Sequence, residues 1–219
     1  MAHCAHIPAF VLHQVTCQFA TGQTLFGPLS VSLEPSLCGL VGRNGVGKTR
    51  LLRLLAGFES PAGGHVERAA AVAWVAQQPT LTPETTLAAL LGYAPVFDAL
   101  FRLEQGNGLA DDFELLDGHW DLTDRLSLAF READLPPFSV DRPAFSLSGG
   151  ERMKALLCGA FVSGADYLLL DEPTNHLDRQ GREWLYHQLE SWQGGALIAS
   201  HDRELLTRMP RIIELTPTA

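Results

Sequence analysis

Residues Gly42 to Thr49 have the types and spacing best suited to chemistry. They read GRNGVGKT and match the pattern G-x-x-x-x-G-K-[ST], in which glycines let backbone N–H groups turn toward phosphate oxygens. In such a loop Lys48 reaches the β- and γ-phosphates of a nucleotide, and the Thr49 hydroxyl binds Mg²⁺. The alternative is a glycine-rich turn without a ligand. The apolar strand pattern before the loop and the helical pattern after it favour phosphate binding.

Two adjacent acids, Asp171 and Glu172, follow the apolar run Tyr167 to Leu170. This run is typical of a strand buried in a parallel sheet, and open α/β sheets bind ligands at the carboxyl ends of such strands. Asp171 is suited to hold Mg²⁺ through water, and Glu172 is suited to orient and polarise an attacking water. Adjacent acids after a strand also occur in solvated loops. The phosphate loop in the same chain favours the catalytic interpretation.

A third motif, FSLSGGERMKAL, places Ser148, Gly149 and Gly150 directly before a predicted helix. A helix N-terminus at this point gives the chain a second position where an anion can bind. Ser-Gly-Gly turns are also common between elements of secondary structure. The position of this one before the acidic strand is what favours a functional interpretation.

Composition limits the classes of function. The net charge is −9, from 16 Lys and Arg against 25 Asp and Glu, which argues against broad nucleic-acid binding because such binding depends on cations that neutralise phosphates. No apolar run reaches the roughly 18 residues that span a bilayer. The N-terminus lacks a signal-peptide pattern. We therefore expect a cytoplasmic protein without a membrane segment of its own.

The four cysteines, at positions 4, 17, 38 and 158, lack metal-type spacing and are predicted to be reduced core residues. His3, Cys4 and His6 could bind a metal together, but a frayed chain terminus is the favoured interpretation.

The elements that must position these motifs alternate between strand and helix at both ends of the chain. Strands are predicted at Phe10–Phe19, Leu29–Leu33, Leu37–Val41, Tyr167–Leu170, Ala196–Ala199 and Arg211–Leu215, with one bent or two short strands over Val66–Val75. Helices are predicted at Thr49–Phe58, around Trp184–Trp192 and at Asp202–Arg208. From Pro83 to Val162 the pattern is mainly helical, which indicates a helical subdomain inserted in an α/β core.

Taken in order, the motifs resemble those of the ATP-binding cassette (ABC) ATPases over nearly the whole chain. Gly42–Thr49 is similar to the Walker A motif of that family, Leu147–Glu151 to its LSGGE signature, and Tyr167–Glu172 to its Walker B motif with the catalytic glutamate. Asn175–Asp178 resembles the D-loop, and Ser200–Asp202 contains the residue that resembles the switch histidine.

The resemblance implies a single cassette over residues 1–219 with a P-loop NTPase fold of the α/β class. The expected ABC-type core has a mostly parallel sheet flanked by helices, an antiparallel β portion, and the inserted helical subdomain at about residues 83–162. The resemblance also implies ATP and Mg²⁺ as ligands, and hydrolysis of ATP to ADP and phosphate.

Particular residues receive roles from the same resemblance. The expected catalytic residues are Lys48, Gln77, Glu172 and His201. The expected ATP-binding residues are Phe19, whose ring would stack on adenine, and Gly42, Arg43, Asn44, Gly45, Val46, Gly47, Lys48, Thr49 and Arg50. The expected Mg²⁺ ligands are Thr49, Gln77 and Asp171, although Gln78 is adjacent and the assignment of Gln77 could shift by one. Ser148, Gly149, Gly150 and Glu151 would contact the ATP of an opposite cassette, with Asp178 in the D-loop.

The sequences EPTNHLD and SHDR resemble the ABC-F branch, whose members usually carry two cassettes and no membrane domain. Only one phosphate loop is present, so the chain is either half of a tandem protein or a single cassette that pairs with another copy or another chain. The resemblance leaves open a slow ATP-dependent clamp on a large partner such as the ribosome, or a nucleotide-binding subunit of a membrane transporter. Three positions depart from the family pattern: Arg50 replaces a second hydroxyl residue, Lys154 an arginine, and Ala76 a proline.

Overall fold

The computed structural model describes residues 7–19 and 21–216, and this part of the chain separates into two compact units. The first unit comprises residues 1–77, 164–175 and 185–219, and the second comprises 78–163 and 176–184. The segment predicted to be a helical subdomain, about 83–162, lies within the second unit, which also takes in 176–184.

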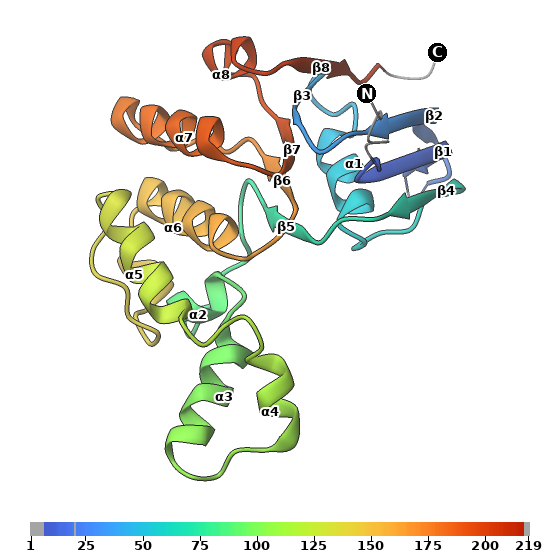
Figure 1. Ribbon diagram of the computed structural model, residues 1–219. Coiled ribbons are helices and arrows are strands. Elements are labelled where there is room, and N and C mark those ends of the chain that lie inside the picture. Colours follow the sequence, from blue (N-terminus) through green and yellow to red (C-terminus); the bar gives the residue numbers. More distant parts are fainter. Residues whose placement is uncertain (1–6, 20, 217–219) are drawn as a thin grey trace, which may run out of the picture. The chain divides into compact units, whose positions relative to one another are not determined.

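The described strands of the first unit form an antiparallel sheet and a parallel sheet (Figure 1). The antiparallel sheet has the order β2-β1-β4 and consists of β1 (Phe10–Gln18), β2 (Thr24–Leu33) and β4 (Gly63–Arg68). The parallel sheet has the order β5-β6-β7-β3-β8 and consists of β3 (Leu37–Val41), β5 (Val72–Val75), β6 (Tyr167–Asp171), β7 (Gly195–Ala199) and β8 (Arg211–Glu214).

Helix α1 (Lys48–Leu55) contacts β1 of the antiparallel sheet and both β6 and β7 of the parallel sheet. Its apolar face joins a core that includes Phe10, Phe26, Leu52 and Tyr167, all fully buried. Every residue of β6 and of β7 is buried, which explains why these strands read as continuous apolar runs. Helix α8 (Arg203–Thr207) and part of α7 (Arg179–Ser191) complete the described elements of the first unit.

Strand β2 and helix α1 differ from their predicted bounds. Strand β2 begins at Thr24 rather than Leu29, because Pro28 interrupts the alternating pattern but is tolerated in a strand at the edge of its sheet. Over Val66–Val75 the structure has two short strands, as one of the two predicted alternatives stated, and these strands, β4 and β5, belong to different sheets. Helix α1 ends at Leu55 rather than Phe58, since Gly57 adopts a left-handed φ of 82° just beyond it.

The second unit is helical where the structure describes it. Its elements are α2 (Leu87–Leu90), α3 (Ala94–Glu104), α4 (Ala110–Leu115), α5 (Leu122–Glu132), a 3₁₀ turn (Ala144–Ser146), α6 (Gly149–Phe161) and the first part of α7. Leu122, Leu126 and Phe130 share a buried face, as their helical spacing predicts. No helix formed by residues 7–19 and 21–216 combines the length and the apolar character needed to cross a membrane.

The cysteines that the structure describes are free and buried, as predicted: Cys17, Cys38 and Cys158. Burial raises the pKa of all three thiols, that of Cys158 to about 12, so they remain protonated and unreactive at neutral pH. Cys4, like the suggested terminal cluster with His3 and His6, lies outside the described residues.

Candidate functional site

The predicted catalytic and Mg²⁺-binding residues of the first unit follow four neighbouring strands of the parallel sheet, β5, β6, β7 and β3. Gln77 comes shortly after β5, Asp171 ends β6, His201 comes shortly after β7, and the phosphate loop begins where β3 ends. Parallel strands end at the same edge of a sheet, so segments far apart in sequence meet there. Lys48 and His201, for example, lie 153 positions apart and are in contact.

A cavity of about 560 Å³ opens at this edge, within the size range of small-molecule sites. Its lining is Phe19, Leu25, Asn44, Gly45, Gly47, Lys48, Thr49, Arg50, Gln77, Asp171, Glu172, Asn175 and His201, all of them in the first unit. Among the described residues, the lining leaves out Gly42, Arg43 and Val46, which were predicted to bind ATP. It includes Gln77 and not the adjacent Gln78.

Two lining residues were not assigned a role from the sequence. Leu25 lies on β2 of the antiparallel sheet, and no signal in the sequence connects that strand to the phosphate loop. Asn175 belongs to the stretch that resembles the D-loop, so its position after the acidic strand was the signal that could have identified it.

The phosphate loop depends on glycines for two different reasons. Gly47 has a φ of 107°, and a Cβ built there would lie 2.7 Å from Leu25 Cδ2 and 2.8 Å from Phe26 Cδ1. Gly45 has a φ of 80°, but no described heavy atom outside its chain neighbours lies within 4 Å of its ideal Cβ position. Gly45 therefore meets a conformational requirement, and Gly47 meets a steric requirement as well.

Gly47 also stands at the N-cap of α1, where the structure describes no side chain that accepts a hydrogen bond from the first turn. The first turn contains no acidic residue. Because the initial N–H groups of a helix have no partners within the helix, those of α1 are available to an anion.

The buried ammonium of Lys48 lies next to this helix start. It donates a hydrogen bond to the carbonyl oxygen of Gly42 at 3.0 Å and contacts Nε2 of His201 at 3.1 Å. Since an ammonium can only donate, Nε2 of His201 is the acceptor in this contact. Lys48 is thus a buried cation that faces a cavity, where phosphate oxygens could replace these neutral acceptors.

Asp171 links the acidic strand to the phosphate loop. Its side chain is buried, and its Oδ2 accepts a hydrogen bond of 2.7 Å from the hydroxyl of Thr49. Burial raises the pKa of Asp171, while the bond from Thr49 and the charge of Lys48 act in the opposite direction. A hydroxyl and a carboxylate side by side at the cavity wall are oxygen ligands of the kind that Mg²⁺ prefers.

Glu172 occupies a strained backbone position beside Asp171. Its φ is 50°, which non-glycine residues rarely adopt, and its N–H donates to the carbonyl of Ala199 at 2.8 Å. Its carboxylate accepts a hydrogen bond of 3.3 Å from the backbone N–H of His201 and lies 3.5 Å from the ring Nε2 of the same residue. Burial raises the pKa of Glu172, while the hydrogen bond from the His201 N–H and the charge of Lys48 act in the opposite direction. The side chain is therefore fixed in place and biased toward a proton-accepting pKa.

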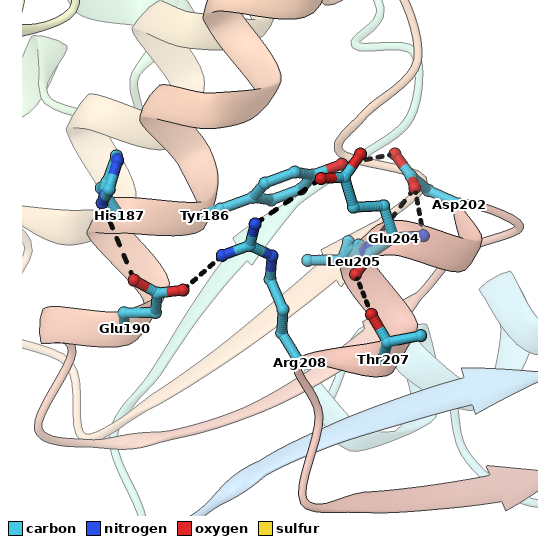
Figure 2. A network of polar contacts seen from close by, with 8 residues as sticks. All are labelled: Tyr186, His187, Glu190, Asp202, Glu204, Leu205, Thr207 and Arg208. Atoms are coloured by element: carbon cyan, nitrogen blue, oxygen red, sulfur yellow. Dashed lines mark hydrogen bonds and ion pairs between the residues drawn. The ribbon is translucent and has the colours of Figure 1, made fainter.

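A network of polar contacts holds the segment that carries His201 (Figure 2). The carboxylate of Asp202 caps the start of α8 and accepts a hydrogen bond of 2.9 Å from the hydroxyl of Tyr186 on α7. The guanidinium of Arg208 lies 4.6 Å from the centre of the Tyr186 ring and pairs with Glu190. His201 is consequently placed between the end of β7 and a helix start that is fastened to α7.

Arg50, which departs from the family pattern, forms two hydrogen bonds within the first unit. It donates to the carbonyl of Gln18 at 2.9 Å and to the carboxylate of Glu59 at 3.2 Å. Burial acts to raise the pKa of Glu59, but hydrogen bonds from Arg53 and Arg50 hold it below its usual range. Arg50 thereby positions the end of β1 directly before Phe19, whose ring lines the cavity.

The signature residues lie in the second unit and do not appear in the cavity lining. Ser148 and Glu151 form a capping box on α6: Ser148 Oγ accepts from the N–H of Glu151 at 3.2 Å, and Glu151 accepts from the N–H of Ser148 at 2.7 Å. The bond from Ser148 holds the pKa of Glu151 low. A Cβ on Gly150 would lie 2.7 Å from the carbonyl oxygen of His176, so this turn requires glycine to pack against residue 176. Asp178 caps a neighbouring turn by accepting from the N–H of Gly181 at 2.7 Å.

The sequence is similar to known proteins over most of its length. The sequence model of the family described as ABC transporter matches residues 27–175. The energy-dependent translational throttle protein EttA of Mycobacterium tuberculosis is 33% identical, with 96% of this chain and 39% of the relative covered. The ATP-binding protein Uup of Caulobacter vibrioides is 38% identical, with 95% of this chain and 30% of the relative covered. The chain thus spans less than half the length of these relatives.

A solved structure gives the fold independently. The dimeric structure of an ATP-binding cassette in a post-hydrolysis state, bound to ADP and Pi, has a TM-score of 0.72 and 19% identity, and the alignment covers 94% of each chain. At this identity the likeness concerns the fold. The predicted fold class, an ABC ATPase core with a parallel sheet, an antiparallel sheet and flanking helices, is confirmed.

Proposed function

The chain belongs to the ABC transporter family as an ATPase cassette, and on that premise we propose that it hydrolyses ATP to ADP and phosphate with Mg²⁺. The observation that carries this proposal is the 2.7 Å hydrogen bond between Thr49 and Asp171, which joins the phosphate loop to the acidic strand at the wall of one cavity. Lys48, Glu172 and His201 face the same cavity.

Binding of the triphosphate is the function of the loop and of helix α1. The open N–H groups at the start of α1 and the ammonium of Lys48 supply donors for phosphate oxygens. Phe19, which is 42% exposed and lines the cavity, would offer the face of its ring to adenine. Stacking is worth about 1–3 kcal/mol and accepts either purine, so it would contribute more to affinity for the base than to selectivity for ATP over GTP.

Mg²⁺ would be held by the oxygens of Thr49 and Asp171, with Gln77 at the same cavity wall. A bound Mg²⁺ would neutralise charge that develops on the transferred phosphoryl group. Burial raises the pKa of Asp171, and this makes the ionised carboxylate a group that gains from a nearby cation.

Glu172 and His201 would act in the hydrolytic step. The fixed carboxylate of Glu172 would orient a water molecule and accept its proton as the oxygen attacks the γ-phosphorus and the bond to the ADP oxygen breaks. His201 would donate to the γ-phosphate oxygens as their charge grows, so its loss would reduce turnover more than affinity.

A complete site would contain two cassettes. The chain has one phosphate loop, and its signature residues Ser148 to Glu151 lie in a different compact unit from the cavity. We infer that these residues contact the nucleotide of an opposite cassette, with Asp178 beside them. The partner would be a second copy or a cassette of another chain.

The variant Glu172→Gln tests hydrolysis and pairing together. It removes the proton acceptor and keeps the shape of the side chain, so phosphate release should stop while ATP binding persists. Light scattering after gel filtration should find a monomer without nucleotide and a dimer with ATP. The matched control is Glu114→Gln, at an exposed position on α4, which should hydrolyse ATP like the wild type. A Glu172→Gln chain that stays monomeric at saturating ATP and micromolar protein would rule out homodimerisation.

The biological partner is proposed from the relatives alone. Because EttA is described as a translational throttle and this chain is 33% identical to it, we infer a cytoplasmic, ribosome-directed role of the ABC-F kind. Co-sedimentation of the Glu172→Gln chain with ribosomes should require ATP and fail with ADP. Failure with both nucleotides, together with a co-purifying polytopic membrane protein, would favour the alternative role of a transporter subunit.

A further inference from the structure

Three metal-ligating side chains gather on the antiparallel sheet of the first unit, and none of the three is in the described lining of the nucleotide cavity. His13 lies on β1 and is paired directly with His65 on β4. Glu67 follows His65 by two positions, so the alternation of a strand places it on the same face. We propose that His13, His65 and Glu67 form a Zn²⁺ site that joins β1 to β4.

Two of the three separations between ligand atoms suit a tetrahedral ion. Oε1 of Glu67 lies 3.1 Å from Nε2 of His13 and 3.7 Å from Nε2 of His65. Zn²⁺ binds nitrogen and oxygen ligands at about 2.0–2.1 Å, so two ligand atoms of a tetrahedral site are separated by roughly 3.3 Å. The observed separations lie within a few tenths of an ångström of this value. All three ligand atoms lie within 4.8 Å of one another.

The two imidazole rings are already arranged in parallel. Their centroids are 4.4 Å apart, and their planes are inclined by only 16°. Both Nε2 atoms approach one carboxylate oxygen, while the in-plane lone pairs of the nearly parallel rings run side by side. Metal binding would require these exposed side chains to rotate about their χ angles until both nitrogens face one ion, and the backbone could stay as it is.

The backbone beneath the rings is held in an unusual form. A bulge interrupts the pairing of β1 after His13, where Gln14 has a φ of 50° and its N–H donates to the hydroxyl of Ser30 at 3.0 Å. Opposite it, Gly64 has a φ of 76°, and a Cβ there would lie 2.2 Å from the carbonyl oxygen of His13. Bulges of this kind direct side chains and recur beside functional sites.

The chemistry of the ligands selects the class of metal. Two imidazole nitrogens favour zinc, copper or nickel over Mg²⁺ and Ca²⁺, which prefer oxygen ligands. Two histidines and one carboxylate leave the fourth tetrahedral position to water. The side chains are between 45% and 65% exposed, so the ion would reach the site from solvent and fasten two neighbouring strands. The same strand β1 leads to Phe19 at the nucleotide cavity.

Zinc titration of the full chain tests the site. The protein is treated with EDTA and freed of nucleotide, and ZnCl₂ binding is then measured by calorimetry. The terminal His3, Cys4 and His6 are replaced in a background variant so that they cannot contribute. Wild type and background variant should each bind one Zn²⁺ at this sheet and gain melting temperature. Co²⁺ should give the visible absorption of a tetrahedral site in both.

The informative variants are His65→Gln alone and His13→Gln combined with His65→Gln, made in the background variant. Either should weaken Zn²⁺ binding at least tenfold and remove the rise in melting temperature, since loss of an outer-shell partner already costs about 10–100-fold. His187→Gln is the matched control, because His187 lies 3.7 Å from Glu190 in a similar pair and should leave zinc binding unchanged. ATP binding by each variant verifies its fold.

The proposal is overturned if His65→Gln binds Zn²⁺ as the background variant does. It is also overturned if the background variant binds no Zn²⁺, since the affinity of the wild type would then belong to the terminal residues. His65 is largely exposed, so its replacement should leave the fold intact, and Zn²⁺ binding can be measured in the variant whichever outcome occurs.

Discussion

Helices α1 and α6 both begin at residues proposed to bind phosphate, and their first turns are built in opposite ways. The N-cap of α1 is Gly47, with no capping side chain among the described residues and no acid in the first turn. The N-cap of α6 is Ser148, whose hydroxyl and backbone N–H are both engaged by Glu151. The start of α1 is open to an anion, whereas the start of α6 already holds its own carboxylate.

This difference indicates when each helix start would contact a nucleotide. Among the described residues no side chain caps the start of α1, so the phosphate loop should bind ATP in an isolated chain. At α6 a phosphate must compete with the Glu151 carboxylate for the N–H of Ser148 and is repelled by its charge. We therefore expect α6 to contact phosphate only when a nucleotide bound to an opposite cassette brings it there.

The largest effect should come from the lysine at the start of α1. Lys48→Ala should weaken ATP binding about 10- to 100-fold and abolish hydrolysis, because charge-assisted hydrogen bonds contribute roughly 1.5–3 kcal/mol. Lys154→Ala on α6 is the matched control, since that ammonium donates to the carbonyl of Ala133 and should leave ATP affinity unchanged. Calorimetry measures both. Equal affinity in wild type and Lys48→Ala would refute the assignment of the phosphate loop.

Replacing Gly47, the N-cap of α1, should also lower the free energy of unfolding. Gly47→Ala combines a left-handed conformation, about 1–2 kcal/mol, with overpacking against Leu25 and Phe26, about 1–3 kcal/mol. Gly45→Ala should cost only the conformational part, because the space around it is open in the described structure. Urea unfolding at neutral pH compares the two. A Gly45→Ala variant that loses as much stability as Gly47→Ala would contradict the steric explanation.

Replacing Ser148, the N-cap of α6, should have a smaller effect. In the isolated chain it should change only the stability. Ser148→Ala should lower the free energy of unfolding by about 1 kcal/mol, since it removes one capping hydrogen bond. ATP affinity of the single chain should not change. Ser148→Asn keeps a capping oxygen and should restore the stability, as measured by thermal melting. Reduced ATP affinity of monomeric Ser148→Ala would argue that α6 binds nucleotide without a partner.

The smallest effect concerns Asp171 and Glu151, whose contributions to the free energy of unfolding should depend on pH in opposite ways. Burial raises the pKa of Asp171, so between its ordinary pKa and that raised value the folded state binds more protons than the unfolded state, and stability falls as pH rises. Asp171→Asn should therefore stabilise the nucleotide-free chain by about 1 kcal/mol at neutral pH, or about 2–4 °C in melting temperature. The gain should disappear at a pH below the ordinary pKa.

Glu151 should show the opposite sign. The N–H of Ser148 holds the pKa of Glu151 low, so its contribution to stability is present above its ordinary pKa and is lost as pH falls through the lowered value. Glu151→Gln should consequently destabilise the chain at neutral pH, and the difference should shrink on acidification. Melting temperatures measured across this pH range would refute the comparison if both variants shifted in the same direction.

The sequence alone predicted the parts of the site that are encoded locally. The glycines of the phosphate loop, Lys48, Thr49 and the acids after β6 could be read from spacing, because a turn and the end of a strand depend on neighbouring residues. The apolar runs of β6 and β7 likewise indicated burial on both faces. The parallel sheet explains why these separate motifs meet, since its strands all end at one edge.

Only the tertiary structure decided features that depend on long-range pairing. It placed Gln77 rather than Gln78 in the cavity lining, and it brought Leu25 there from another sheet. It also placed His13 opposite His65 on the neighbouring strand. The sequence could not show this pairing, because a shift of the strand register by one residue turns every side chain to the other face. The bulge at Gln14 and the close approach at Gly64 fix that register, and both arise from contacts between strands rather than within them.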